Sequence, residues 1–170
     1  MDPRIRPLAA ADAASFQALR LEALARCPTA FSAALEEELS QGLEEVRARL
    51  REETVLGAFV DRDLCGMAGF RRPAQAKKYH KGTLWGVYVR PGIRREGLGS
   101  ALVAAVIAHA QGEVAQLHAA VLTSNDTARR LYRRLGFIAY GIEPGGLRVG
   151  EEDLDQELLV LRFGDASARP

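Results

Sequence analysis

The sequence has no excess of charge of one sign and few residues of the kinds that bind metals. Its 23 lysine and arginine residues nearly balance 22 acidic residues, so the formal net charge is +1. A surface that binds nucleic acid usually carries a basic excess, and we therefore expect no nucleic-acid partner. The 3 histidines are scattered along the chain, which predicts no metal site. Aromatic residues are also scarce, at 6%, and charged residues make up 26%, a composition typical of a globular domain.

Cysteine is nearly absent as well. Cys27 and Cys65 have no metal-binding or redox spacing, and although one disulfide is possible by number, nothing in the sequence indicates an oxidising compartment. Cys65 lies in an apolar segment, where a free cysteine packs like a small hydrophobic residue. We therefore expect no catalytic cysteine.

Long apolar runs are missing too. The longest uncharged stretch extends from Gly97 to Gly112, which is shorter than the roughly 20 residues that a membrane-spanning helix needs. The opening residues Met1 to Arg4 are not followed by the apolar core of a secretory signal. We therefore expect no membrane partner and a cytoplasmic location. At this length we expect one domain over residues 1–163, followed by a frayed tail at 164–170.

The most informative segment extends from Val89 to Leu102. A strand-like stretch leads into a basic loop with several glycines, and an apolar helix follows. Such a loop directs backbone N–H groups to one point, and the helix dipole adds partial positive charge there. Glycine lets a ligand approach the backbone closely because it has no Cβ. The segment therefore predicts a phosphate site.

The spacing of this loop narrows the choice of phosphate ligand. It reads Arg94-x-x-Gly97-x-Gly99, which matches neither the Gly-x-Gly-x-x-Gly fingerprint of dinucleotide sites nor the Gly-Lys-Ser/Thr of nucleoside-triphosphate loops. The pattern resembles the coenzyme A pyrophosphate loop of the GNAT superfamily of N-acetyltransferases. By itself it also fits an ordinary strand-to-helix turn.

A second segment downstream supports the resemblance. Asn125-x-x-Ala128-x-x-x-Tyr132-x-x-x-Gly136-Phe137 is similar to the second GNAT signature at every defined position. Its local physics predicts a helix, which either Asn125 or Asp126 caps at its start. Gly136 would supply the left-handed residue that ends this helix.

The order of the predicted elements agrees with this family. We expect an α/β fold of the GNAT type, with a mixed, mostly antiparallel central sheet that is splayed in the middle and flanked by about four helices. The predicted strands cover residues 4–8, 54–60, 64–70, 84–89, 113–122, 137–141 and 156–163. The predicted helices begin after Asp12 and Ser40, cover 101–111, and follow Asn125.

The resemblance also implies roles for individual residues. The pantetheine arm of acetyl-CoA would lie in the splayed gap, and Tyr132 would donate a proton to the leaving thiolate as general acid. The implied coenzyme ligands are the backbone of Val87, Tyr88 and Val89, the loop residues Arg94, Arg95, Glu96, Gly97, Leu98, Gly99 and Ser100, and the side chains of Asn125 and Tyr132. No metal is implied.

The general base and the acceptor pocket are less well defined. Many relatives carry a glutamate on the strand before the loop, but residues 82–89 contain no carboxylate. Deprotonation would then go through water or through a carboxylate elsewhere, with Glu36, Glu37 and Glu143 as candidates. A solvated position is the simpler expectation for all three, and for Glu38 beside them. The resemblance places the acceptor pocket at residues 29–32, Trp85 and residues 143–155, with Trp85 either in the core or in the pocket wall.

Three functions fit these observations. The first is acetyl transfer from acetyl-CoA to the primary amine of a small or amino-acid-like acceptor, by direct attack in a ternary complex. The second is a non-catalytic acyl-CoA-binding module or sensor, and the third is acetylation of protein N-termini or lysines. Relatives often dimerise through sheet edges, which makes a homodimer possible.

Overall fold

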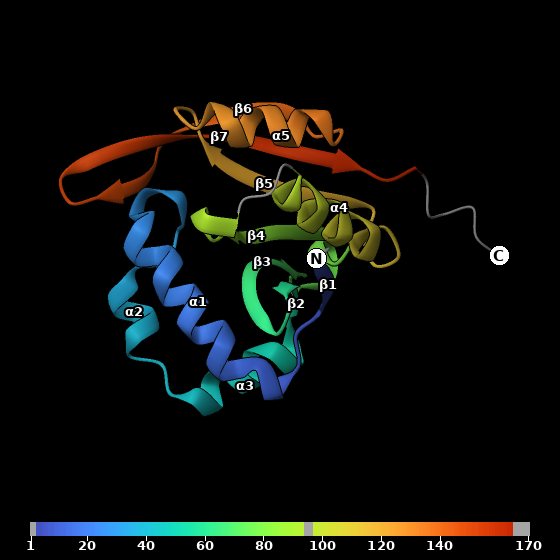
Figure 1. Ribbon diagram of the computed structural model, residues 1–170. Coiled ribbons are helices and arrows are strands. Elements are labelled where there is room, and N and C mark those ends of the chain that lie inside the picture. The colour runs from blue at the N-terminus through green and yellow to red at the C-terminus, as the bar shows by residue number, and fades with distance from the viewer. Residues whose placement is uncertain (1–2, 94–96, 165–170) are drawn as a thin grey trace.

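The computed structural model describes residues 3–93 and 97–164, which form a seven-stranded sheet with helices on both faces (Figure 1). The order of the strands across the sheet is β1-β2-β3-β4-β5-β7-β6. The strands are β1 (Arg4–Pro7), β2 (Thr54–Val60), β3 (Asp63–Arg71), β4 (Lys81–Val89), β5 (Gln116–Leu122), β6 (Ile138–Val149) and β7 (Glu152–Arg162). The helices are α1 (Ala13–Arg26), α2 (Leu35–Leu39), α3 (Leu43–Glu52), α4 (Leu98–Gln111) and α5 (Asp126–Arg134).

The sheet is mixed and opens in its middle, as expected. Neighbouring strands are antiparallel except β4 and β5, which run parallel. These two strands pair only from Lys81 to Thr83 on β4, opposite Gln116 to His118 on β5. Beyond Thr83 they diverge, and β5 continues its pairing with β7 alone. The predicted splay is therefore confirmed.

A bulge in β4 marks the point of divergence. The register moves from Met67 opposite Tyr88 to Gly69 opposite Trp85, so β4 has one more residue than β3 across this step. Gly86 lies within the extra stretch and has a φ of +64°, a left-handed conformation that side-chain-bearing residues rarely adopt. The bulge turns the strand away from β5.

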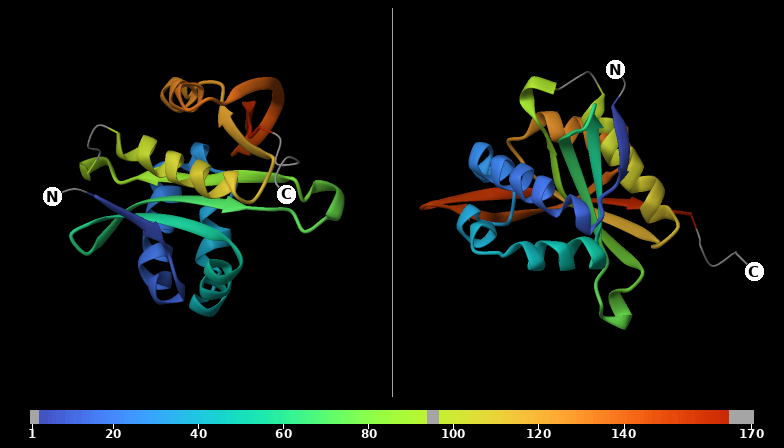
Figure 2. Two further views of the ribbon diagram at one scale, coloured as in Figure 1. Left: turned by 90° about the vertical axis from the view of Figure 1, so that its right-hand side faces the viewer. Right: turned by 60° about the horizontal axis from the view of Figure 1, so that its bottom comes forward.

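Two hydrophobic cores hold the layers together. Helix α4 packs on one face of β2 to β5, and the helices α1, α2 and α3 cover the opposite face of the first strands (Figure 2). The α4 core contains Leu102, Leu117 and Leu159, which are all fully buried. The second core contains Phe16 and Met67, which are buried to the same degree. No helix in the described part of the chain is long and apolar enough to cross a membrane.

The last two strands differ from the prediction. Short strands at 137–141 and 156–163 were expected, with a loop between them, whereas β6 and β7 form one long hairpin that turns at Gly150. Register shifts between Ala139 and Gly141 and between Glu143 and Leu147 interrupt the pairing. These irregularities break the period-two alternation from which strands are recognised, so the sequence hides the continuous hairpin.

The start of the third helix was also predicted wrongly. Ser40 follows a short unpredicted helix, α2, and its hydroxyl donates to the Glu37 carbonyl at 2.7 Å. Helix α3 begins after Gly42, whose backbone N–H donates to Glu45 at 2.9 Å. At α5 the expected cap is present, because the Asn125 side chain accepts from the Ala128 N–H at 3.1 Å.

Candidate active site

A small cavity lies where β4 and β5 diverge. Its volume is about 130 Å³, and α5 closes one side of it. Strand β4 contributes Leu84, Trp85, Gly86 and Val87 to its wall, and the region of α5 contributes Asn125, Ala128, Leu131 and Tyr132. The gap in the sheet is therefore a lined slot, with polar side chains from α5 and also from Thr29 and Gln156.

Tyr132 contributes a phenol group to the lining of this slot. Its side chain is buried and packs against Phe137, with ring centroids 5.5 Å apart. Burial raises the pKa of Tyr132 to about 12, because the charged phenolate would lose its hydration. Within the described ranges no group hydrogen-bonds to its hydroxyl, so the hydroxyl is free to donate to a ligand.

Asn125 faces the same slot from the start of α5. Its Oδ1 is occupied by the helix cap, which fixes the orientation of the side chain. The Nδ2 group makes no hydrogen bond to any residue of the described chain, so both of its N–H donors remain for a ligand. The cap and the ligand contact are compatible because they use opposite ends of the amide.

The loop before α4 is described only in part. Arg94, Arg95 and Glu96, which were expected to contact the coenzyme, lie outside the described residues. Gly97 precedes the helix in a left-handed conformation with a φ of +98°. Its carbonyl accepts from the Ala101 N–H at 2.8 Å.

The first turn of α4 begins directly after Gly97. The N–H groups of Leu98, Gly99 and Ser100 precede the first intrahelical bond, and such groups bind anions in many proteins. A Cβ on Gly99 would meet only a methyl of Val89, at 3.9 Å. The protein's own packing therefore gives no reason for glycine at this position, whereas a closely approaching ligand does.

The strand before the loop uses its side chains for packing rather than for chemistry. The Tyr88 hydroxyl donates to Glu22 at 3.1 Å, and Arg90 forms an ion pair with the same carboxylate at 2.8 Å. Both contacts tie the end of β4 to α1. Strand β4 carries no carboxylate, in agreement with its sequence. Only the backbone of Val87, Tyr88 and Val89 was expected to contact the coenzyme.

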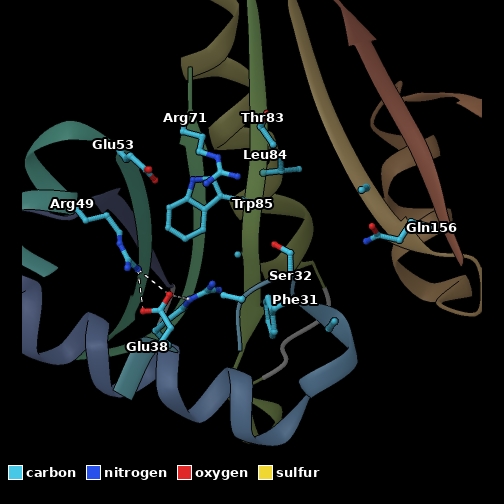
Figure 3. A pocket seen from close by; sticks show the side chains of 15 residues that line it. Phe31, Ser32, Glu38, Arg49, Glu53, Arg71, Thr83, Leu84, Trp85 and Gln156 are labelled. Atoms are coloured by element: carbon cyan, nitrogen blue, oxygen red, sulfur yellow. Dashed lines mark hydrogen bonds and ion pairs between the residues drawn. The ribbon is translucent and has the colours of Figure 1, made fainter. Parts of the chain in front are cut away.

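A larger cavity of about 510 Å³ adjoins the slot (Figure 3). Both cavities are lined by the same stretch of β4, which includes Trp85 and Gly86, and by Gln156 of β7. In Figure 3 Arg71 lies above the Trp85 ring, Glu53 and Arg49 lie on one side, and Gln156 lies on the other. The larger cavity is therefore a second chamber that meets the slot at the β4 bulge.

The larger cavity is lined by charged groups that the sequence did not reveal as a set. Glu38 is only 5% exposed and lies between Arg20, at 3.3 Å, and Arg49, at 3.1 Å. The expectation that Glu38 is solvated was wrong. The carboxyl of Glu53 lines the same cavity, and burial raises its pKa. Arg71 completes the set.

Comparison with known families identifies the family to which this chain belongs. The sequence model of the family described as "Acetyltransferase (GNAT) family" matches residues 18–137, which include both predicted signatures. The chain belongs to the GNAT family of acetyltransferases. No curated protein matches the sequence.

Solved structures show the same fold. An acetyltransferase of the GNAT family from Streptococcus pneumoniae is 24% identical with a TM-score of 0.84, over 96% of this chain and 100% of its own. The putative acetyltransferase yncA from Salmonella typhimurium, solved with acetyl-CoA, is 22% identical with a TM-score of 0.81, over 100% and 99%. A phosphinothricin acetyltransferase from Sinorhizobium meliloti, in complex with AcCoA, is 19% identical with a TM-score of 0.82, over 100% and 94%.

Some base and pocket candidates of this GNAT acetyltransferase lie away from the slot. Glu37 caps α2 by accepting from the Ala34 N–H at 3.0 Å. Glu36 lines a separate cavity beside the β6–β7 hairpin, and Glu143 is exposed on β6 opposite Gln156. Of the expected acceptor-pocket residues, Ala30, Phe31, Ser32 and Trp85 line the larger cavity. In residues 3–93 and 97–164 no group of three or more possible metal ligands occurs.

Helix α5 is fastened to the sheet by an ion-pair cluster. Glu157 of β7 is buried, and its Oε1 accepts from Arg129 at 3.1 Å and from Arg133 at 2.7 Å. Arg129 is partly buried in this cluster, whereas Arg133 stays exposed. The cluster lies on the helix that carries Tyr132, so it holds the slot wall in place.

Proposed function

We propose that the protein transfers the acetyl group of acetyl-CoA to the primary amine of a small or amino-acid-like acceptor, by direct attack in a ternary complex. The observation that carries this proposal is the junction of two cavities at Gly86. One cavity is small and is lined by the phenol of Tyr132, and the other is larger and lined by charged side chains. A thioester at the junction is within reach of an amine in the larger cavity.

The coenzyme would occupy the slot and the loop beside it. We assign the pantetheine arm to the gap beside Val87, Tyr88 and Val89, because the pairing of β4 with β5 ends at Thr83. We assign the pyrophosphate to the α4 N-terminus, where Gly97 to Ser100 offer N–H groups. Arg94, Arg95 and Glu96 complete this assignment as proposed ligands. Asn125 would donate an Nδ2–H hydrogen bond to the pantetheine arm.

Tyr132 would act on the leaving sulfur. The amine nitrogen attacks the thioester carbon, a C–N bond forms, and the C–S bond breaks. The sulfur leaves as a thiolate that accepts the Tyr132 proton, and the proton released by the attacking nitrogen returns to the phenolate through water. A pKa of about 12 keeps this donor protonated at every working pH. Because an ordinary thiol has a pKa of about 8.5, the hydrogen bond to sulfur contributes more than complete transfer does.

No side chain is assigned as the base. Strand β4 has no carboxylate, and Glu38 is held by two arginines. The acceptor would therefore react as a neutral amine that loses its proton to water in the larger cavity. The rate should then follow the pKa of the acceptor amine.

A screen for thiol release tests this function. Purified protein with acetyl-CoA is offered a broad panel of amines, amino acids and peptides, and release of the coenzyme thiol is followed. Turnover with a small amine that Tyr132→Phe abolishes supports the enzyme. Coenzyme binding without turnover across the panel supports the non-catalytic sensor, and turnover with peptides alone supports protein acetylation.

Two further expectations accompany this proposal. A cytoplasmic location is tested by cell fractionation, and a homodimer is tested by light scattering on the purified chain. Neither result changes the assignment of the slot, since all of its assigned residues lie in one chain.

A further inference from the structure

The larger cavity contains an unusual pair of nitrogen atoms. Arg20 Nη1 and Trp85 Nε1 are the two buried side-chain polar atoms that lack a hydrogen-bond partner in residues 3–93 and 97–164, and both residues line this one cavity. A buried donor without a partner costs about 1–3 kcal/mol. Two such costs in one chamber point to a ligand that satisfies both groups, and both are donors.

The guanidinium of Arg20 is held in place by its neighbours, while its Nη1 atom has no hydrogen-bond partner among the described residues. Its Nε donates to Glu38 at 3.3 Å, and its carbon lies 5.2 Å from the Phe31 ring and 5.4 Å from the Trp85 ring. Arg20 is only 6% exposed. Fixed by one carboxylate and two aromatic rings, the Nη groups form a prepared fork of the kind that binds carboxylates.

The charges around the cavity favour an anion. Three arginines, Arg20, Arg49 and Arg71, face two glutamates, Glu38 and Glu53. Glu38 is shared by Arg20 and Arg49, and burial raises the pKa of Glu53, which makes its charged form less favourable. The lining therefore has a formal excess of positive charge when both glutamates are ionised, and a larger excess when Glu53 is protonated.

The position of the fork fixes the anion near the reaction centre. A Cβ built on Gly86 would lie 3.3 Å from Arg20 Nη1, and Gly86 borders both the slot and the larger cavity. An anionic group bound by Arg20 is then close to an amine that attacks a thioester at the same junction. A carboxylate on the carbon next to the amine, as in an α-amino acid, has this spacing.

We propose that Arg20 and the Trp85 indole N–H form a subsite for the carboxylate of the acceptor, and that the acceptor is a free α-amino acid or a close analogue. This inference rests on the proposed acetyl transfer. It adds a substrate class and two specificity residues that the slot alone does not indicate. Peptide N-termini lack the free carboxylate and are disfavoured by the same contact.

The first experiment compares matched acceptors. Each standard amino acid is offered beside its amide with saturating acetyl-CoA, and kcat/KM is calculated for both from the concentration of the neutral amine, because the amine of an amino acid amide is less basic than that of the acid. A charge-assisted hydrogen bond contributes about 1.5–3 kcal/mol, so the acid should be preferred over the amide by roughly 10- to 100-fold. Equal kcat/KM values for acids and amides overturn the proposal and favour acetylation of peptides or proteins.

The second experiment tests the residues through the same ratio. Arg20→Gln should reduce the acid-to-amide ratio to near one, and the ratio is independent of the fraction of protein that is folded. Should Arg20→Gln yield no folded protein, Trp85→Phe serves instead, because it keeps the ring and removes the N–H. Arg26→Gln, an exposed arginine of the same helix, is the matched control and should keep the ratio. An unchanged ratio in both Arg20→Gln and Trp85→Phe overturns the proposal.

A binding measurement separates this inference from the proposed function. Trp85 is the only tryptophan of the chain, so intrinsic fluorescence reports directly on the cavity. N-acetylalanine should change this fluorescence in wild type at concentrations at which N-acetylalanine amide does not, and Arg20→Gln should remove the difference. If wild type acetylates no amine, the proposed function fails while this titration still decides the subsite. Identical responses to acid and amide overturn the subsite alone.

Discussion

Gly86 and Arg20 fit each other so closely that a Cβ on the glycine would lie 3.3 Å from Nη1 of the arginine. The glycine also has a φ of +64° at the bulge of β4. One residue therefore permits both the turn that opens the sheet and the close approach of a buried cation. The slot and the larger cavity therefore meet at Gly86, next to the positive charge of Arg20.

Gly86→Ala tests that relationship. A side chain in the left-handed region costs about 1–2 kcal/mol, so the free energy of unfolding should fall by this amount. Turnover should fall further than stability explains, because the new methyl displaces the Arg20 guanidinium. Denaturant unfolding and steady-state kinetics measure the two effects. Gly141→Ala, where a Cβ meets nothing within 4 Å, is the control and should change neither. Full activity in Gly86→Ala would exclude a role for this contact.

Gly99→Ala should separate stability from coenzyme binding. Alanine is favoured over glycine within a helix by up to about 1 kcal/mol, and among the described residues only a Val89 methyl, at 3.9 Å, lies near its Cβ. We therefore expect equal or higher stability together with weaker binding of coenzyme A. Calorimetric titration with coenzyme A and thermal unfolding give the two values. Gly112→Ala at the other end of α4 should leave coenzyme affinity unchanged, and equal affinities in wild type and Gly99→Ala would refute the proposed pyrophosphate site.

Tyr132→Phe should remove a proton donor without weakening the fold. The hydroxyl has no partner within the described residues, so its loss leaves no unpaired group behind and the melting temperature should hold or rise. If donation to sulfur limits the rate, kcat should fall about 10²–10⁴-fold while the KM for acetyl-CoA changes little. Tyr79→Phe, an exposed tyrosine beside Arg72, is the control. Unchanged kcat in Tyr132→Phe would end the general-acid assignment.

The pH profile of kcat carries a separate prediction. Burial raises the pKa of Tyr132 to about 12, so the donor form persists through the alkaline range and no alkaline limb should appear near the ordinary tyrosine value of about 10. On the acid side the rate should rise with pH until the acceptor amine is neutral. Acceptors with lower amine pKa values should move this limb to lower pH. If the acid limb of the pH profile lies at the same pH for all acceptors, a side chain of the protein acts as the base.

The cluster on Glu157 predicts a non-additive effect on stability. Arg129→Met and Arg133→Met each leave the buried carboxylate with one partner, whereas the double variant leaves it with neither and should be the least stable of the three. The loss in the double variant should exceed the sum of the two single losses. Arg130→Met on the exposed face of α5 is the control. Strict additivity in denaturant unfolding would show that the two arginines act independently.

The same cluster predicts an acid dependence. The Arg129 and Arg133 guanidinium groups lower the pKa of Glu157 from its ordinary value of 4.5, so its folded-state pKa lies below its unfolded value. The stabilisation is then present above pH 4.5 and is lost as pH falls through the folded-state pKa. In Glu157→Gln this part of the acid dependence should disappear, as unfolding measured across the acid range would show.

The sequence predicted those features that local patterns encode. The cap at Asn125 and the glycine before α4 follow from short motifs with defined spacing, whereas the divergence of β4 from β5 was implied by the family resemblance. The β6–β7 hairpin was missed because its register shifts remove the alternation that marks a strand. Local patterns thus suffice where a motif encodes the geometry by itself.

The charged cavity could not be assembled from local patterns, because its members come from distant segments. Arg20 gave one signal, since it shares the apolar face of α1 with Phe16 and Leu24. Glu38 looked like part of a solvated acidic run, and only the tertiary fold brings Arg20 and Arg49 to it. Burial, pairing and orphaned donors are properties of the folded chain, which is why the acceptor chamber was not predicted in detail.

The fate of a labelled acetyl group tests the central claim most directly. Protein is mixed with acetyl-CoA that carries a radioactive acetyl group, with and without a free amino acid, and both protein and small molecules are analysed after a single turnover. Direct transfer predicts that the label appears in an N-acetylated small molecule only when acceptor is present, with none bound to the protein. Label that stays on coenzyme A with every acceptor, or that first becomes attached to the protein, would contradict the account.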